Sequence, residues 1–125
     1  MSTPPRLDVA DVQRALREFA AARDWEQFHT PKNLVMALAG EVGELCDLFQ
    51  WLDADQSRRI MDDPKRAAAV GEEIADVLNY VLRLADVLGV DLQAAVGAKI
   101  VANAAKYPAD LVRGRADKYT GYRDE

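Results

Sequence analysis

The sequence predicts an all-α protein, built as a four-helix bundle from a single domain. Apolar residues recur at alternating steps of three and four along most of the chain, which is the period of an amphipathic helix, and strand patterns are nearly absent. A chain of 125 residues, half of them apolar and 30% charged, can bury one hydrophobic core but is too short for two domains. We therefore expect one domain over residues 1–125, in which residues 108–125 form an irregular C-terminal tail.

A first helix is expected over residues 9–23, with Asp8 as its N-cap. Its apolar stripe consists of Val12, Leu16, Phe19 and Ala20. The polar segment DWEQFH at residues 24–29 should form a loop that separates this helix from the next.

A second helix is expected over residues 31–52, because Thr30 supplies an N-cap and Pro31 fits the first helical position. Its leucines fall at alternating steps of four and three: Leu34, Leu38, Leu45, Leu48 and Leu52. Glu41 takes the place in this stripe where a leucine would be expected, so its side chain should face the core. The polar stretch that follows, residues 53–63, has room for one short helical turn.

A third helix is expected over residues 64–88, capped by Asp63 and ended by Gly89. Its apolar stripe consists of Val70, Ile74, Val77, Val81, Leu84 and Leu88. A fourth helix, capped by Asp91, should extend to about Tyr107.

Carboxylates form two pairs with a spacing of three residues, which places each pair on one helix face: Glu41 with Glu44, and Glu73 with Asp76. Like charges so placed repel, and burial strengthens the repulsion, so a cation is expected between them. A single Glu-x-x-Glu is common on helix surfaces. The prediction therefore depends on two pairs occurring on two helices, and on the place of Glu41 in the leucine stripe.

The chain has one histidine, His29, and one cysteine, Cys46. This excludes zinc sites built from several histidines or cysteines, and the Glu-x-x-His pairs of di-iron bundles. An all-oxygen ligand set suits Mg²⁺, with Mn²⁺ as a substitute, or Ca²⁺; we favour Mg²⁺ because it usually serves phosphate chemistry.

The net charge of −5 and the pI near 4.9 argue against a nucleic-acid polymer as the main partner. No apolar run approaches the roughly 20 residues of a membrane span, and the N-terminal residues contain no signal-peptide apolar segment. A cytoplasmic protein without a membrane partner is the expectation.

Two segments, EVGELCDLFQW at residues 41–51 and EEIADVLNYVL at 72–82, resemble the ExxE and ExxD motifs of the all-α, MazG-like nucleoside triphosphate pyrophosphohydrolases. The flanking DWEQFHTPKNLVMAL and the late YPADLVRGRADKYT resemble the dCTP pyrophosphatase branch most closely. The resemblance extends over about residues 19–120. It implies Mg²⁺-dependent cleavage between the α- and β-phosphates of a dNTP, most simply dCTP or a modified dCTP, to the dNMP and pyrophosphate.

The resemblance also implies roles for single residues. Matching the two motifs gives the metal ligands Glu41, Glu44, Glu73 and Asp76. The base that orients the attacking water is one of these four or Glu72, and the sequence leaves the choice open.

The base pocket of the dCTP branch corresponds here to Trp25, Phe28, His29 and Trp51, with Tyr80 under the deoxyribose. Aromatic faces suit a nucleobase, since stacking contributes roughly 1–3 kcal/mol per base. Trp51 can also be explained as a core residue at a helix end. Leu16 stands where some members carry a polar substrate-contacting residue, which weakens the expectation about the base.

Basic residues late in the chain are expected to contact the triphosphate. Spacing places Lys99, Asn103 and Lys106 on one helix face, and Arg113 follows in the tail. The segment NAAKYP matches the Asn-to-Tyr-Pro segment of the family. A solvated basic face is the alternative explanation, and the better one for Arg115.

Apolar residues outside the main stripes would leave a lone bundle partly exposed: Val35, Met36, Val42, Phe49, Leu78 and Leu82. We expect an obligate oligomer. The resemblance implies a homotetramer built from dimers, or at least a dimer, whose pockets are completed by a neighbour.

Other functions stay open at this point. A non-catalytic helical interaction module would leave the carboxylates without a purpose, and a metal-storage bundle would lack histidines. Within the enzyme class, the alternative is a broad or other-base pyrophosphohydrolase that acts on dUTP, dATP or damaged nucleotides.

Overall fold

The computed structural model describes residues 3–122, and within this range the regular elements are all helical. The chain divides into two units, Met1–Gly89 and Val90–Glu125. The first unit contains α1 (Val9–Ala22), η1 (Glu26–Phe28), α2 (Pro31–Phe49), α3 (Ala54–Arg58), η2 (Ile60–Asp62) and α4 (Pro64–Leu88). The second contains α5 (Leu92–Lys106), α6 (Ala109–Val112) and η3 (Tyr119–Tyr122).

Helix ends lie close to where the capping residues predicted them. Each expected N-cap accepts a hydrogen bond from a backbone N–H in the first turn of its helix: Asp8, Thr30, Asp63 and Asp91. Gly89 ends α4 in the left-handed conformation, with φ 71°. Helix α2 ends at Phe49, earlier than expected, and α3 then begins with a capping box between Asp53 and Gln56.

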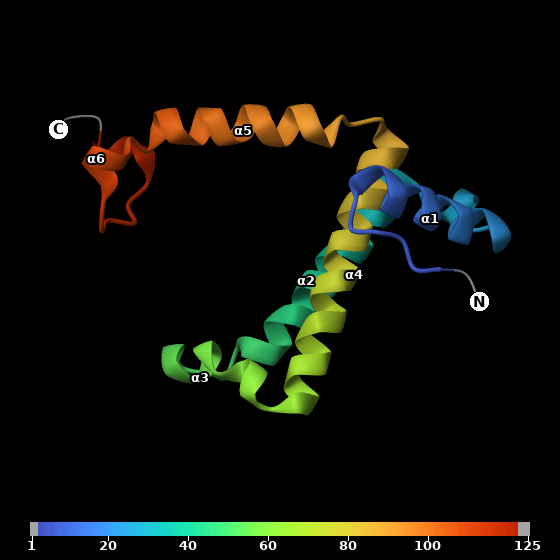
Figure 1. The fold of residues 1–125 in the computed structure, drawn as a ribbon, viewed down its shortest axis with the longest axis horizontal. Coiled ribbons are helices and arrows are strands. Elements are labelled where there is room, and N and C mark those ends of the chain that lie inside the picture. The colour runs from blue at the N-terminus through green and yellow to red at the C-terminus, as the bar shows by residue number, and fades with distance from the viewer. Residues whose placement is uncertain (1–2, 123–125) are drawn as a thin grey trace. The chain divides into compact units, whose positions relative to one another are not determined.

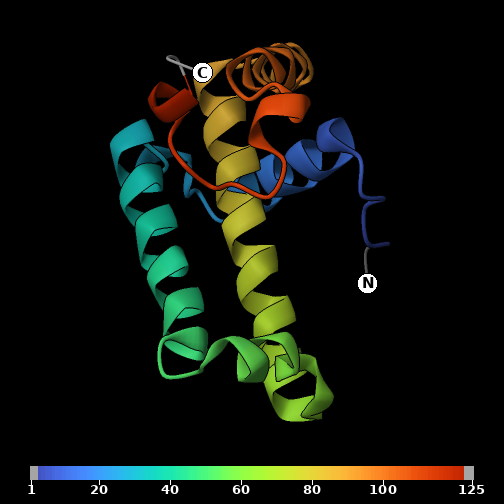
Figure 2. The ribbon, with the colours of Figure 1, turned by 90° about the vertical axis from the view of Figure 1, so that its left-hand side faces the viewer.

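Within the first unit, α2 and α4 lie side by side and run antiparallel, and α1 packs on the C-terminal part of α4 (Figures 1 and 2). The most deeply buried large side chain is Leu34, which is 2% exposed. The other buried apolar residues are Val12, Ala20, Ile60, Val70, Leu82 and Ala85.

The expectation that Leu82 would be exposed in the single chain was wrong. Leu82 is 4% exposed. Its carbonyl oxygen accepts a hydrogen bond from Nε2 of Gln13 at 3.0 Å, because α1 crosses α4 at this point. Conversely, Ile74 and Leu88, which belong to the expected stripe, are 53% and 54% exposed. The spacing of apolar residues predicted helix α4 correctly but did not indicate which of its faces α1 covers.

In the second unit, the tail is less irregular than expected, since α6 and η3 form short helical turns within it. Among the helices of residues 3–122, none has both the length and the apolar character needed to cross a membrane.

Candidate metal and nucleotide site

Three carboxylates meet where α2 and α4 lie side by side. Glu41 comes from α2, and Glu73 and Asp76 come from successive turns of α4. One oxygen from each lies within 4.8 Å of the other two. We refer to these three residues as the acidic cluster. Three of the four carboxylates predicted from the sequence are therefore brought together, whereas Glu44 is exposed, near Glu41 but outside this group.

Two oxygens of the acidic cluster are buried without a hydrogen-bond partner among the described residues, Oε2 of Glu41 and Oε2 of Glu73. The nearby carboxyl group of Glu44 raises the pKa of Glu41 to about 7, and burial and the carboxylates of Glu73 and Asp76 add to the shift. Burial also raises the pKa of Glu73, and the negative charge of Glu44 raises it further. Both shifts express the free-energy cost of burying carboxylates close to one another.

A hard divalent cation fits this site. The donors are all carboxylate oxygens, which Mg²⁺, Mn²⁺ and Ca²⁺ prefer. The two buried oxygens without partners are the groups that a cation would satisfy. Glu41, Glu73 and Asp76 would bind it, with Glu44 within reach of Glu41.

A cavity of about 350 Å³ adjoins the acidic cluster, a volume typical of small-molecule sites. Its lining residues are Leu16, Phe19, Trp25, His29, Asp76, Asn79, Tyr80 and Arg83. We refer to it as the aromatic pocket. Asp76 belongs to both the pocket and the cluster, so a ligand in the pocket lies directly beside the carboxylates.

Trp25 forms one wall of the pocket because the chain turns back sharply after α1. Asp24 adopts the left-handed conformation with φ 54°, which Asp tolerates better than most residues. The backbone N–H of Trp25 then donates to the carbonyl oxygen of Ala20 at 2.9 Å. The indole packs edge-to-face on Phe19, with 5.7 Å between ring centroids.

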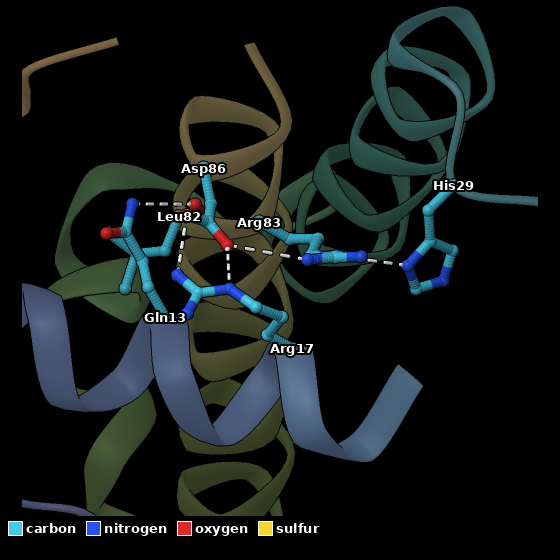
Figure 3. A network of polar contacts seen from close by, with 6 residues as sticks. All are labelled: Gln13, Arg17, His29, Leu82, Arg83 and Asp86. Carbon is cyan, nitrogen blue, oxygen red and sulfur yellow. Dashed lines mark hydrogen bonds and ion pairs between the residues drawn. The ribbon is translucent and has the colours of Figure 1, made fainter. Parts of the chain in front are cut away.

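A polar network of four side chains, Arg17, His29, Arg83 and Asp86, adjoins the pocket through His29 and Arg83 (Figure 3). Its central residue, Arg83, was not among the predicted site residues. Arg83 is 8% exposed, and its Nε–H donates to Nδ1 of His29 at 3.1 Å. Its Nη1 lies 3.5 Å from Oδ2 of Asp86. Arg17 of α1 donates to both oxygens of Asp86, at 3.0 and 2.9 Å. The signal that was available was an arginine flanked directly by Leu82 and Leu84, three residues after Tyr80 on the same helix face.

The network shifts the pKa values of its members in the directions that their contacts require. Hydrogen bonds from Arg17 lower the pKa of Asp86. Burial and the nearby charge of Arg83 lower the pKa of His29, so its imidazole stays neutral near pH 7. A neutral ring agrees with Nδ1 accepting from Arg83, and it leaves the proton on Nε2.

Comparison with known proteins decides the family. The sequence pattern of the MazG-like family matches residues 37–121. The chain belongs to the MazG-like family. The resemblance found in the ExxE and ExxD segments is thus confirmed, and the whole acidic cluster of this MazG-like protein lies inside the matched range.

Curated relatives match nearly all of the MazG-like chain. It is 49% identical over 119 residues to dCTP pyrophosphatase 1 of Rattus norvegicus, covering 95% of this chain and 70% of that protein. It is 47% identical over 119 residues to dCTP pyrophosphatase 1 of Homo sapiens, with the same coverage of 95% and 70%. A solved pyrophosphatase of Archaeoglobus fulgidus superposes with a TM-score of 0.75 at 38% identity, covering 86% of this chain and 99% of that one.

The other residues singled out in the MazG-like sequence lie in several places. Trp25, His29 and Tyr80 line the aromatic pocket. Phe28 and Trp51 are 58% and 87% exposed and do not line it. Glu72 is exposed, one residue before Glu73. The second unit contains the basic set and its amide neighbour, Lys99, Asn103, Lys106 and Arg113.

Proposed function

We propose that this MazG-like protein is a nucleoside triphosphate pyrophosphohydrolase that cleaves dCTP, or a modified dCTP, to the monophosphate and pyrophosphate. The identity of 47–49% to proteins named dCTP pyrophosphatase 1 supports the substrate. The observation that carries the proposal is the junction at Asp76, where the acidic cluster with its unpartnered oxygens meets an aromatic pocket. A nucleoside triphosphate fits both parts of this site, with its phosphates at the cation held by the acidic cluster and its base in the aromatic pocket.

In this proposal Glu41, Glu44, Glu73 and Asp76 bind Mg²⁺, for which Mn²⁺ can substitute. The ion supplies neutralisation of the triphosphate charge and a lowered pKa for a water ligand. One of these carboxylates or Glu72 orients the attacking water and accepts its proton. Attack on the α-phosphorus with pyrophosphate as leaving group gives the two products.

The nucleoside is bound by the pocket side chains. The base stacks against Trp25 beside His29, and Tyr80 lies under the deoxyribose, where its ring disfavours a 2′-hydroxyl. Lys99, Asn103, Lys106 and Arg113 contact the triphosphate. A neighbouring subunit places Phe28 and Trp51 around the base, which accounts for the exposure of both residues in the single chain.

The proposed oligomer is supported by the apolar side chains that α2 and α4 expose. On α2 and α4, Val35, Met36, Val42 and Leu78 are between 39% and 64% exposed. We propose that residues 1–125 form one domain, in which α5 completes a four-helix bundle with α1, α2 and α4. Two such bundles then pair through the remaining apolar surface, as a dimer or a homotetramer. We place the enzyme in the cytoplasm.

A panel of dNTPs and NTPs with Mg²⁺ tests the function, with pyrophosphate and orthophosphate measured separately. We expect pyrophosphate as the product and dCTP as the preferred substrate. Orthophosphate as the direct product would contradict cleavage between the α- and β-phosphates. Leu16 in the pocket wall favours one alternative, a broad or other-base enzyme acting on dUTP, dATP or damaged nucleotides, and equal rates for all bases would establish it.

A further inference from the structure

We propose that Arg83 determines which base this site accepts, by donating two parallel hydrogen bonds to the adjacent O2 and N3 acceptors of cytosine. The inference rests on the proposed function, because it assumes that the base occupies the aromatic pocket. It assigns the recognition of the base to a residue of α4 that neither the family motifs nor the pocket aromatics include.

The position of Arg83 fits the far end of a bound nucleotide. Asp76, Tyr80 and Arg83 follow one another on the same face of α4, and all three line the pocket. Seven residues of helix separate Asp76 from Arg83, which is roughly 10 Å along the axis. A nucleotide whose phosphates lie at the acidic cluster, and whose sugar lies at Tyr80, would therefore bring the edge of its base to Arg83.

The guanidinium has donors left for a ligand. Two of its five N–H groups are used, one on Nε toward His29 and one on Nη1 toward Asp86. Among the contacts of residues 3–122, Nη2 has no partner. One N–H on Nη1 and both on Nη2 therefore remain, so the guanidinium has a coplanar pair of nitrogens with donors to spare. Such a pair matches two adjacent acceptors in one plane.

The network holds this donor pair in place. Asp86 is fixed by two hydrogen bonds from Arg17, and His29 accepts from Arg83 on the opposite side (Figure 3). A buried arginine with partners on both sides loses little rotamer freedom when a ligand binds. Because His29 is neutral, it does not repel the guanidinium.

Base chemistry then decides between substrates. Cytosine offers two adjacent acceptors, O2 and N3, on its Watson–Crick edge. Uracil has an N–H at position 3, which would face a donor and leave a buried hydrogen bond unmade. Substitution at C5 of cytosine leaves O2 and N3 unchanged, so modified dCTP stays a substrate. Guanine also offers adjacent acceptors, O6 and N7, but only on its Hoogsteen edge.

The test compares the full-length wild type with Arg83→Lys, Arg83→Met and, as a matched control, Arg14→Met. Lysine keeps the positive charge beside Asp86 but lacks the planar fork, so it guards against misfolding of the methionine variant. Two quantities are measured, the Kd values of dCMP and dUMP by calorimetry and kcat/KM for dCTP, dUTP and dGTP with Mg²⁺. Neither variant of Arg83 should keep the preference for cytosine, with dCMP affinity lowered about 10- to 100-fold and dUMP affinity little changed.

Arg14→Met should leave the ratio of the dCMP and dUMP affinities unchanged, because Arg14 is an exposed residue of α1 that pairs with Asp11 and does not line the pocket. Equal loss of the ratio in Arg14→Met would show that the loss of any arginine charge, and not contact with Arg83, changes the selectivity. Wild-type selectivity in Arg83→Lys, or a wild-type preference for dGTP, would also overturn the proposal.

The same data separate this proposal from the proposed function. If the wild type binds dCMP selectively through Arg83 but releases no pyrophosphate, the enzymatic function fails and the role of Arg83 stands. If pyrophosphate is released and the Arg83 variants keep the preference for dCTP, the function stands and the role of Arg83 fails. A wild type that neither binds dCMP nor cleaves dCTP would overturn both.

Discussion

The two polar regions of α4, the acidic cluster and the network around Arg83, differ in how their charges are compensated. In the network each charge meets an opposite one, since Asp86 contacts both Arg17 and Arg83. In the cluster like charges meet, and two buried oxygens have no partner among the described residues. A buried polar group without a partner costs free energy, so the cluster favours a bound cation, whereas the opposite charges of the network compensate one another without one. Burial alone therefore does not identify a cation site; buried carboxylates without a compensating charge do.

Removal of a carboxylate from the cluster should give the largest effect on activity. Glu73→Gln keeps the shape of the side chain and removes its charge, so kcat with Mg²⁺ should fall about 10²- to 10³-fold, equivalent to the several kcal/mol that metal stabilisation of the transition state contributes. The matched control is Glu18→Gln, an exposed residue of α1 away from the cluster. Activity of Glu73→Gln within the range of this control would remove the cluster from the mechanism.

Removal of the shared anion from the network should mainly affect stability. Asp86→Asn leaves the buried guanidinium of Arg83 without an anion, so the free energy of unfolding should fall by about 2–3 kcal/mol, below the full cost of breaking a buried pair because Arg17 is half exposed. Urea unfolding measures this change. The exposed pair of Asp55 and Arg58 gives the comparison, since Asp55→Asn should cost less than about 0.5 kcal/mol.

The uncompensated cluster should also show itself in the pH dependence of stability, as the smallest of the three effects. The pKa of Glu41 is raised from 4.5 to about 7, so the folded state binds the extra proton between these pH values and the wild type loses stability as pH rises through that window. Glu41→Gln imitates the protonated form. In EDTA it should melt higher than the wild type at pH 8, with a gap that narrows toward pH 4.5.

Mg²⁺ should reverse the order of the two melting temperatures at pH 8. The cation stabilises the folded wild type by binding the Glu41 carboxylate, which the Glu41→Gln variant lacks. Thermal unfolding in EDTA and in Mg²⁺ provides both measurements. A pH-independent gap between the two proteins would mean that Glu41 ionises normally and that the cluster is not strained.

Local signals in the sequence predicted much of the fold. The caps Asp8, Thr30 and Asp63 and the stop at Gly89 each act within one helical turn, so their effect can be read without knowing the tertiary structure. The inward position of Glu41 followed in the same way from the leucine spacing of its own helix.

The features that the sequence did not predict depend on contacts between distant segments. Arg83 and His29 are 54 residues apart, and their hydrogen bond exists only because the segment after α1 packs beside α4. The burial of Leu82 likewise depends on where α1 crosses. Helical period identifies an apolar face but does not say which part of it a partner helix covers, so such contacts cannot be predicted from the sequence of one helix.

Asp76 belongs to both the acidic cluster and the aromatic pocket, so α4 determines the distance between the phosphate site and the base site. A helix is stiff along its axis, so the separation between the carboxylates and Arg83 is fixed. A purine nucleotide would still bind through its triphosphate, but its larger base would displace the α-phosphorus from the geometry needed for attack. Under the proposed function, purine triphosphates would then act as competitive inhibitors, and their concentrations would affect the rate of dCTP cleavage.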